Sequence, residues 1–317
     1  MNTPRATALQ MCPFSAYLEA GLLARFDVVR WFELAPAEQA AWLRDNAATV
    51  RAIATGGHVG CPSELMKALP QLGLIAINGV GVDKVDLALA RERGVRVSTT
   101  PGTLTEDVAD LAVGLVISLL RGIPSADAYV RTGAWSTQGD LPLARKVSGR
   151  HFGIVGLGQI GAAIAARLAP FGPVAYTGPS AKPGQPYAFQ PDLLALARDS
   201  DVLVLSCPAN ATTRQLIDAP VLEALGPEGW LVNVARGAVV DEDALIAALE
   251  AGHIAGAALD VYEDEPRVPR ALQSNPRTVL TPHMASATRE TRQAMADLVL
   301  ANLDALLTGG ALASAVV

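Results

Sequence analysis

The fold of this chain is decided by one glycine-rich stretch, Gly153-Ile154-Val155-Gly156-Leu157-Gly158-Gln159-Ile160-Gly161. Gly156 permits a tight turn, Gly158 lets a pyrophosphate approach the backbone, and Gly161 lets a helix pack closely on a strand. The N–H groups of Gln159 and Ile160, at the start of the helix, would then face the phosphates. The stretch therefore predicts a dinucleotide-binding turn. A tight turn without a ligand and a methyl-donor site are the alternatives.

Short apolar runs alternate with helical patterns on both sides of this turn. The first third of the chain has strand candidates at 28–33, 51–55, 74–78 and 95–99, separated by helical patterns such as 37–46 and 62–69. A second series has strand candidates at 152–155, 174–177, 202–207, 230–235, 256–261 and 279–281, with helical patterns at 159–171 and 241–250. Such alternation is typical of parallel sheets covered by helices, so we expect the α/β class.

Two breaks in the pattern indicate how the domains are divided. Thr99-Thr100-Pro101-Gly102 ends the first series, and an apolar helix is expected over 103–121. The last helix, over 287–307, follows the complete second series, so we expect it to return to the first domain. The predicted domains are a discontinuous substrate domain, 1–100 plus 287–317, and a dinucleotide-binding domain, 101–286.

Composition excludes several classes of function. The chain has 317 residues, 50% hydrophobic and 18% charged, with a net charge of −6, which suits about two domains of roughly 150 residues. It has no basic patch for nucleic acid, and its longest apolar run, 111–120, is too short to cross a membrane. The three cysteines lack metal-ligand spacing and are expected to be free thiols. We therefore expect a cytoplasmic protein that has no signal peptide and binds no metal. We also expect neither a nucleic acid nor a membrane as a partner.

The usual second half of the dinucleotide pattern is missing. A site that prefers NAD needs a carboxylate about 20 residues after the turn, but the first acid here is Asp192. The region instead reads Tyr176-Thr177-Gly178-Pro179-Ser180-Ala181-Lys182. Without an acid, nothing repels a 2′-phosphate, and Thr177, Ser180 and Lys182 offer hydroxyl groups and one cation. The sequence predicts NADP as the preferred cofactor by a moderate ratio, with NAD also used.

Three later apolar runs each lead to an ionisable residue: Arg236 in 233–237, Glu265 in 259–266 and His283 in 281–283. A guanidinium matches a carboxylate in shape, and histidine titrates near neutral pH. With Glu265 as a partner for His283, the set can bind a 2-oxo acid and move one proton, which predicts a 2-hydroxy acid dehydrogenase. The alternatives are a structural ion pair for Arg236, a structural role for His283 and a solvated charge for Glu265.

These residues resemble the D-isomer-specific 2-hydroxyacid dehydrogenase family. The matching stretches occur in the family's order at 80–86, 104–110, 153–161, 233–237, 256–266 and 282–288. The resemblance implies two Rossmann-like, doubly wound parallel-sheet domains with the active site in an inter-domain cleft. Within the family, glyoxylate, hydroxypyruvate and hydroxyphenylpyruvate reductases look closest. A glutamine replaces Glu265 in the formate dehydrogenase branch, so that branch is not expected.

The same resemblance implies roles for individual residues. Arg236 would orient the carboxylate and oxo group of the substrate, His283 would be the acid/base, and Glu265 would hold the imidazole. Further substrate contacts are implied for Gly56, Gly57, Val80 and Gly81. Further cofactor contacts are expected at Thr105, Cys207, Pro208, Thr213, Val234, Asp260 and Ser286. Pro179 stands where many reductases carry an arginine, which limits the expected preference for NADP.

Two further hypotheses concern partners. The helix expected over 103–121 is apolar on nearly every side and must be covered all round. Together with the resemblance, this predicts a homodimer in which an arm over 129–135 reaches the second copy. The alternative function, from a different class, is a dinucleotide-sensing, corepressor-like scaffold that binds the cofactor without turnover.

Overall fold

The computed structural model describes residues 5–317, which form two compact units. The units are unit 1, Met1–Leu104 with Ala287–Val317, and unit 2, Thr105–Ser286. Residues 1–4, the start of the expected substrate domain, lie outside the described part. Residues 101–104 group with unit 1, and Thr291 Oγ1 donates a hydrogen bond of 3.2 Å to the carbonyl of Thr103. That bond ties the end of this turn to a helix of unit 1.

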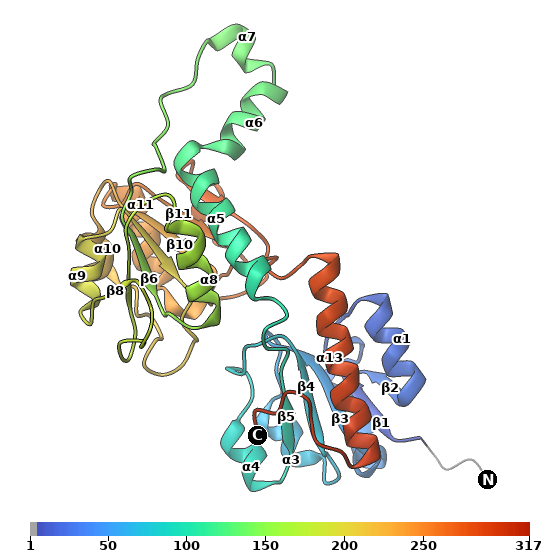
Figure 1. The fold of residues 1–317 in the computed structure, drawn as a ribbon. Helices are drawn as coiled ribbons and strands as arrows, with labels where there is room; N and C mark the ends of the chain where they lie inside the picture. The colour runs from blue at the N-terminus through green and yellow to red at the C-terminus, as the bar shows by residue number, and fades with distance from the viewer. Residues whose placement is uncertain (1–4) are drawn as a thin grey trace. The chain divides into compact units, whose positions relative to one another are not determined.

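Unit 1 is a five-stranded parallel sheet with helices on both faces (Figure 1). Its strands follow the order β2-β1-β3-β4-β5 and span Thr7–Gln10 (β1), Asp27–Arg30 (β2), Val50–Gly56 (β3), Leu74–Asn78 (β4) and Arg96–Ser98 (β5). Its helices are α1 (Ala16–Arg25), α2 (Pro36–Asn46), α3 (Ser63–Ala68), α4 (Leu87–Glu92) and α13 (Arg289–Thr308). The strand expected over 28–33 is wrong at its end, because Trp31–Glu33 is a short 3-10 helix that turns Trp31 into the core.

Alternation along the strands gives unit 1 two different cores. Small residues such as Ala8, Ala52 and Ala54 face α1 and α13 on one side of the sheet. Larger neighbours, including Leu9 and Ile53, belong to the core on the other side. Because successive side chains of a strand point to opposite faces, both packings come from the same strands.

The end of the chain covers the β5 edge of this sheet. Val97 donates a backbone hydrogen bond to Val317 (3.1 Å), and Val316 donates one to Val97 (2.7 Å). Asn302 on α13, which is fully buried, donates to Ser314 Oγ at 2.8 Å, and this hydroxyl donates to the carbonyl of Thr99. Pairing an edge strand in this way removes its unpaired backbone groups.

Unit 2 contains a seven-stranded parallel sheet of order β12-β11-β10-β9-β6-β7-β8. The strands are β6 (Phe152–Val155), β7 (Val174–Thr177), β8 (Ala188–Phe189), β9 (Val202–Leu205), β10 (Trp230–Asn233), β11 (Gly256–Leu259) and β12 (Thr278–Leu280). The direction of winding reverses between β6 and β9, and in open α/β sheets ligands bind outside the carboxyl ends of the strands at such a point. The doubly wound α/β fold expected from the sequence is confirmed.

Helices cover both faces of this sheet (Figure 1). The helices α5 (Thr105–Arg121) and α8 (Gln159–Leu168) pack on each other, and α9 (Leu193–Arg198), α10 (Ala219–Leu225), α11 (Glu242–Ala251) and α12 (Arg270–Gln273) complete the unit. Strands β9, β10 and β11 end two residues earlier than expected. Cys207, Val234 and Val261 are buried in the loops that follow, so their apolar character reflects burial and not strand pairing.

An arm extends from the end of α5, as Figure 1 shows. It consists of α6 (Ile123–Arg131) and α7 (Ala134–Gln138), followed by an extended segment over 139–147. Over residues 5–317, no single helix is long and apolar enough to cross a membrane. The bent pair of α5 and α6 meets that test by length and composition only.

Candidate active site

The glycine turn lies between β6 and α8, at the point where the strand order of the sheet reverses. Gly156 has φ of +95°, and an added Cβ would lie 2.7 Å from Cα and 2.8 Å from N of Cys207. Glycine is therefore required twice, once for the conformation and once for the close approach of the β9 loop. This contact brings Cys207-Pro208, predicted to line the cofactor, beside the turn.

The other two glycines have opposite surroundings. A Cβ on Gly161 would collide with the carbonyl oxygen of Gly156 and lie 2.7 Å from Ser206 Oγ, so α8 packs directly against the turn. A Cβ on Gly158 would meet nothing within 4 Å. Packing within the protein therefore does not require a glycine at that position. The open space leaves room for a pyrophosphate to approach the N–H groups of Gln159 and Ile160. These residues fit a dinucleotide.

The other predicted cofactor residues lie in the same unit, in loops or at the start of a helix. Thr213 Oγ1 donates to the carbonyl of Pro208 at 2.7 Å, so it fastens the loop after β9. Thr105 is the first residue of α5, Val234 follows β10, and Ser286 ends the unit. Thr105 and Ser286 are at the ends of unit 2, where the chain leaves for unit 1.

The loop after β7 carries no acid. Thr177 is buried at the end of the strand, whereas Ser180 and Lys182 are exposed. Asp192 caps α9, where its carboxylate accepts from the backbone N–H of Leu194 at 2.9 Å. The first acid after the glycine turn is therefore already used in holding a helix.

Arg236 follows β10 in a loop that Asn233 organises. Asn233 is 1% exposed, accepts from Ala235 N at 2.9 Å and donates to the carbonyl of Arg236 at 3.1 Å. A Cβ on Gly237 would run into the carbonyl group of Tyr262, so the loops after β10 and β11 pass at backbone contact. Sequence reasoning noted Gly237 as part of the arginine motif but missed this approach.

Glu265 and His283 form a close pair in the loops after β11 and β12. Glu265 Oε2 lies 2.6 Å from His283 Nδ1, and Glu265 Oε1 accepts from the backbone N–H of Tyr262 at 3.0 Å. The side chains are 22% and 33% exposed, so Nδ1 is engaged while the ring keeps access to solvent. A carboxylate beside an imidazole stabilises its protonated form.

The loop that carries His283 is held by Asp260. This carboxylate is 1% exposed and accepts from Thr281 Oγ1 (2.6 Å) and from the backbone N–H groups of Met284 (2.9 Å) and Ala285 (3.0 Å). The backbone of His283 has φ of +50°, which is uncommon for a residue with a side chain. The sequence predicted Asp260 as a cofactor contact. It did not reveal that Asp260 also fixes the histidine loop.

Tyr262 is a second organiser that the sequence did not single out. Its hydroxyl lies 3.1 Å from the carbonyl oxygen of Leu259 and 3.0 Å from that of Thr281, which links the ends of β11 and β12. Burial, followed by the charge of Asp260, raises the pKa of Tyr262 to about 12. The hydroxyl therefore stays a neutral donor. A tyrosine beside the acidic stretch was the only signal in the sequence.

The predicted substrate contacts of unit 1 lie in two loops that pack on each other. Gly56 and Gly57 end β3 and begin its loop, while Val80 and Gly81 follow β4. A Cβ on Gly57 would lie 3.2 Å from the carbonyl oxygen of Gly81, so the backbones of these loops are nearly in contact. Over residues 5–317, no group of three or more histidine, cysteine or acidic side chains could hold a metal ion.

A dinucleotide turn at the switch point and a paired imidazole in the same unit define an oxidoreductase class that uses a nicotinamide cofactor. The family model for the D-isomer specific 2-hydroxyacid dehydrogenase, NAD binding domain, matches residues 113–285. The chain belongs to the D-isomer-specific 2-hydroxyacid dehydrogenase family. It is an NAD(P)-dependent enzyme of that family, and the resemblance read from the sequence is confirmed.

Several relatives are similar over nearly their whole length. A glyoxylate/hydroxypyruvate reductase of Arabidopsis thaliana and the hydroxyphenylpyruvate reductase of Plectranthus scutellarioides are each 46% identical over 310 residues, 98% of both chains. The solved structure of an NADPH-dependent glyoxylate/hydroxypyruvate reductase from Sinorhizobium meliloti, in complex with NADP and malonate, superposes with a TM-score of 0.92 at 41% identity. It covers 98% of this chain and 97% of its own. These relatives give no support to the scaffold alternative.

The glycine turn offers a matched pair of substitutions. Gly161→Ala should lower the free energy of unfolding by about 1–3 kcal/mol, because the new methyl group overpacks the turn. Gly158→Ala meets no protein atom, so it should leave stability nearly unchanged and weaken cofactor binding. Thermal melts and calorimetric titration with NADPH separate the two effects. Equal melting temperatures for both variants would contradict the packing argument.

Proposed function

We propose that this enzyme reduces glyoxylate, hydroxypyruvate or a similar 2-oxo acid to the D-2-hydroxy acid, with Arg236, Glu265 and His283 as the catalytic set. The observation that carries the proposal is the 2.6 Å contact between Glu265 and His283. Both residues lie in the unit that carries the glycine turn. The names of the relatives at 46% identity agree with this substrate class.

The reaction needs two transfers, a hydride to the carbonyl carbon and a proton to the carbonyl oxygen. The bound reduced nicotinamide supplies the hydride. His283 donates the proton, and Glu265 stabilises the imidazolium before transfer. Arg236 presents a planar cation to the carboxylate and the oxo group, and stabilises the negative charge that develops on the oxygen.

The substrate carboxylate also needs uncharged hydrogen-bond donors. We assign these to the backbone amides of Val80 and Gly81, joined by the loop of Gly56 and Gly57. The small distance between these loops supports the assignment, because glycine leaves backbone N–H groups accessible to an anion.

NADPH is proposed as the preferred cofactor, with NADH used less well. The loop after β7 has no acid to repel a 2′-phosphate, and Lys182 is exposed within it. The related enzyme from Sinorhizobium meliloti is described as NADPH-dependent. Since Pro179 replaces the arginine of many relatives, one exposed lysine contributes about 0–1 kcal/mol and the preference stays moderate.

The decisive experiment is a panel of 2-oxo acids with both cofactors. Oxidation of NADPH should be fastest with glyoxylate, hydroxypyruvate or hydroxyphenylpyruvate, and kcat/KM should be higher for NADPH than for NADH. Binding of NADPH without turnover of any 2-oxo acid would instead support the scaffold alternative. A higher kcat/KM with NADH would overturn the cofactor assignment alone.

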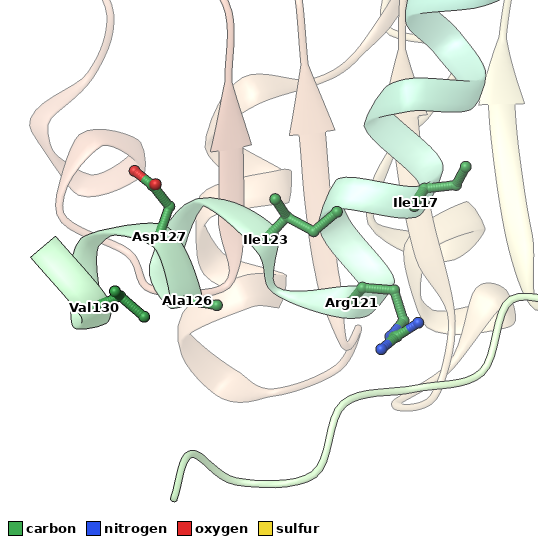
Figure 2. A pocket seen from close by; sticks show the side chains of 6 residues that line it. All are labelled: Ile117, Arg121, Ile123, Ala126, Asp127 and Val130. Carbon is green, nitrogen blue, oxygen red and sulfur yellow. The ribbon is translucent and has the colours of Figure 1, made fainter. Parts of the chain in front are cut away.

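The arm is the proposed site of homodimer formation. Ile117, Arg121, Ile123, Ala126, Asp127 and Val130 line a pocket between α5 and α6 (Figure 2). The arm and the segment after it expose Ile123 (47%), Val130 (57%), Trp135 (60%) and Leu143 (100%). So many large apolar side chains in one segment favour a protein partner, and a second copy of this chain would cover them.

A cytoplasmic location is also proposed, since the three cysteines are free and buried.

Replacing the acid/base tests the proposed chemistry. His283→Ala should reduce turnover by roughly 10²-fold or more, which is typical of the loss of a general acid. Binding of NADPH should change little, because the glycine turn is untouched. His253→Ala, which alters an exposed histidine in the loop between α11 and β11, is the control. Near-normal turnover of the His283 variant would rule out the assignment.

Glu265→Gln tests the role of the carboxylate as the partner of the imidazole. The amide is close to the carboxylate in size but carries no charge, so it stabilises the positive charge on the ring of His283 less well. The kcat for reduction should fall by roughly 10-fold, as expected for the loss of one charge-assisted hydrogen bond, while KM for NADPH stays unchanged. Steady-state kinetics of both proteins measure the effect. An unchanged kcat would mean that Glu265 only shapes the loop.

Negative charges introduced on the arm test the proposed homodimer. Ile123→Glu with Val130→Glu should convert a dimer mass to a monomer mass in light scattering, because two carboxylates cannot be buried unpaired. Leu23→Glu is the control, since Leu23 is 54% exposed on α1 and lies outside the arm. A wild-type protein that is monomeric at micromolar concentration would contradict the proposal.

A further inference from the structure

Tyr176 is a core tyrosine at the end of β7 whose hydroxyl reaches an exposed loop. The residue is 2% exposed, and its ring centre lies 5.3 Å from that of Phe189 on β8. Its phenolic oxygen accepts a hydrogen bond of 2.6 Å from the backbone N–H of Lys182. A rigid part of the sheet thus holds the backbone of the one lysine in this loop.

The loop has little else to fix it. Apart from that bond, residues 178–186 make one further hydrogen bond in the described structure, from Gln185 N to the carbonyl of Lys182 at 3.4 Å. Pro179, Pro183 and Pro186 have no N–H group to donate. Within residues 5–317, the bond to Tyr176 is therefore the only hydrogen bond that ties this loop to the sheet.

We propose that Tyr176 is a positioning residue for cofactor choice, which it controls by fixing the backbone from which Lys182 reaches a 2′-phosphate. The inference rests on the proposed use of NADPH. A lysine is a compact charge on a flexible stem, and ordering that stem costs conformational entropy. Fixing the backbone at Lys182 removes the backbone part of the ordering cost, so only the side chain remains to be ordered when it binds. The position of the Lys182 backbone matters more here than in relatives with an arginine, because Pro179 offers no second cation.

The test compares two probes that differ only in the 2′-phosphate, 2′,5′-ADP and 5′-AMP. In calorimetric titration, Tyr176→Phe should weaken binding of 2′,5′-ADP by about 2- to 5-fold, which is no more than the loss expected for removing the Lys182 charge itself, and leave 5′-AMP unchanged. KM for NADPH should rise by a similar factor while kcat stays constant. Tyr187→Phe is the matched control, since it removes a neighbouring hydroxyl that makes no hydrogen bond in the described structure.

A double-substitution cycle separates positioning from general damage. Because Tyr176 acts through Lys182, adding Tyr176→Phe to Lys182→Ala should produce no further loss of 2′,5′-ADP binding. An additive loss, an equal weakening of both probes or unchanged binding in Tyr176→Phe would each overturn the proposal. Wild-type protein that binds 2′,5′-ADP no more tightly than 5′-AMP would overturn the NADPH preference itself, a result that differs from a failure of Tyr176 alone.

Discussion

The buried carboxylate of Asp260 is the interaction on which the site depends most. A charge with 1% exposure is costly unless donors surround it. Thr281 and the amides of Met284 and Ala285 supply those donors, and no extended course of the chain would bring all three to one side chain. The loop is therefore folded back over the end of β11, and His283 takes its unusual conformation between these anchors. Glu265 meets the imidazole only because this loop is fixed.

Close backbone approach is the second constraint. Gly156 lies against Cys207, and Gly237 lies against Tyr262, at distances that leave no room for a methyl group. Parallel strands place their carboxyl ends along one edge of the sheet, and these two contacts draw the loops of that edge together. The glycine turn and the proposed catalytic residues are thus carried by loops of one packed edge, so a substitution in one loop changes the packing of its neighbour.

The loop after β7, which we propose sets the cofactor preference, takes no part in these two backbone contacts. The loop after β7 lies outside the core, lacks the usual acid and is tied to the sheet by one hydrogen bond from Lys182 to Tyr176. Its sequence can vary without disturbing the packing around Asp260 or the pairing of Glu265 with His283. On the proposed assignments, the preference between the two cofactors can change while the catalytic set stays the same.

The α/β class, the glycine turn and the family could be predicted from the sequence alone, because they depend on local periodicity and on motifs that are contiguous in the chain. It also pointed to Arg236, Glu265 and His283 as candidates. It did not reveal where strands end, since Val234 and Val261 are apolar for burial in loops and not for pairing. The role of Asp260 in holding the histidine loop became visible only in the folded chain, because hydrogen bonds between residues more than 20 positions apart produce no periodic pattern in the sequence.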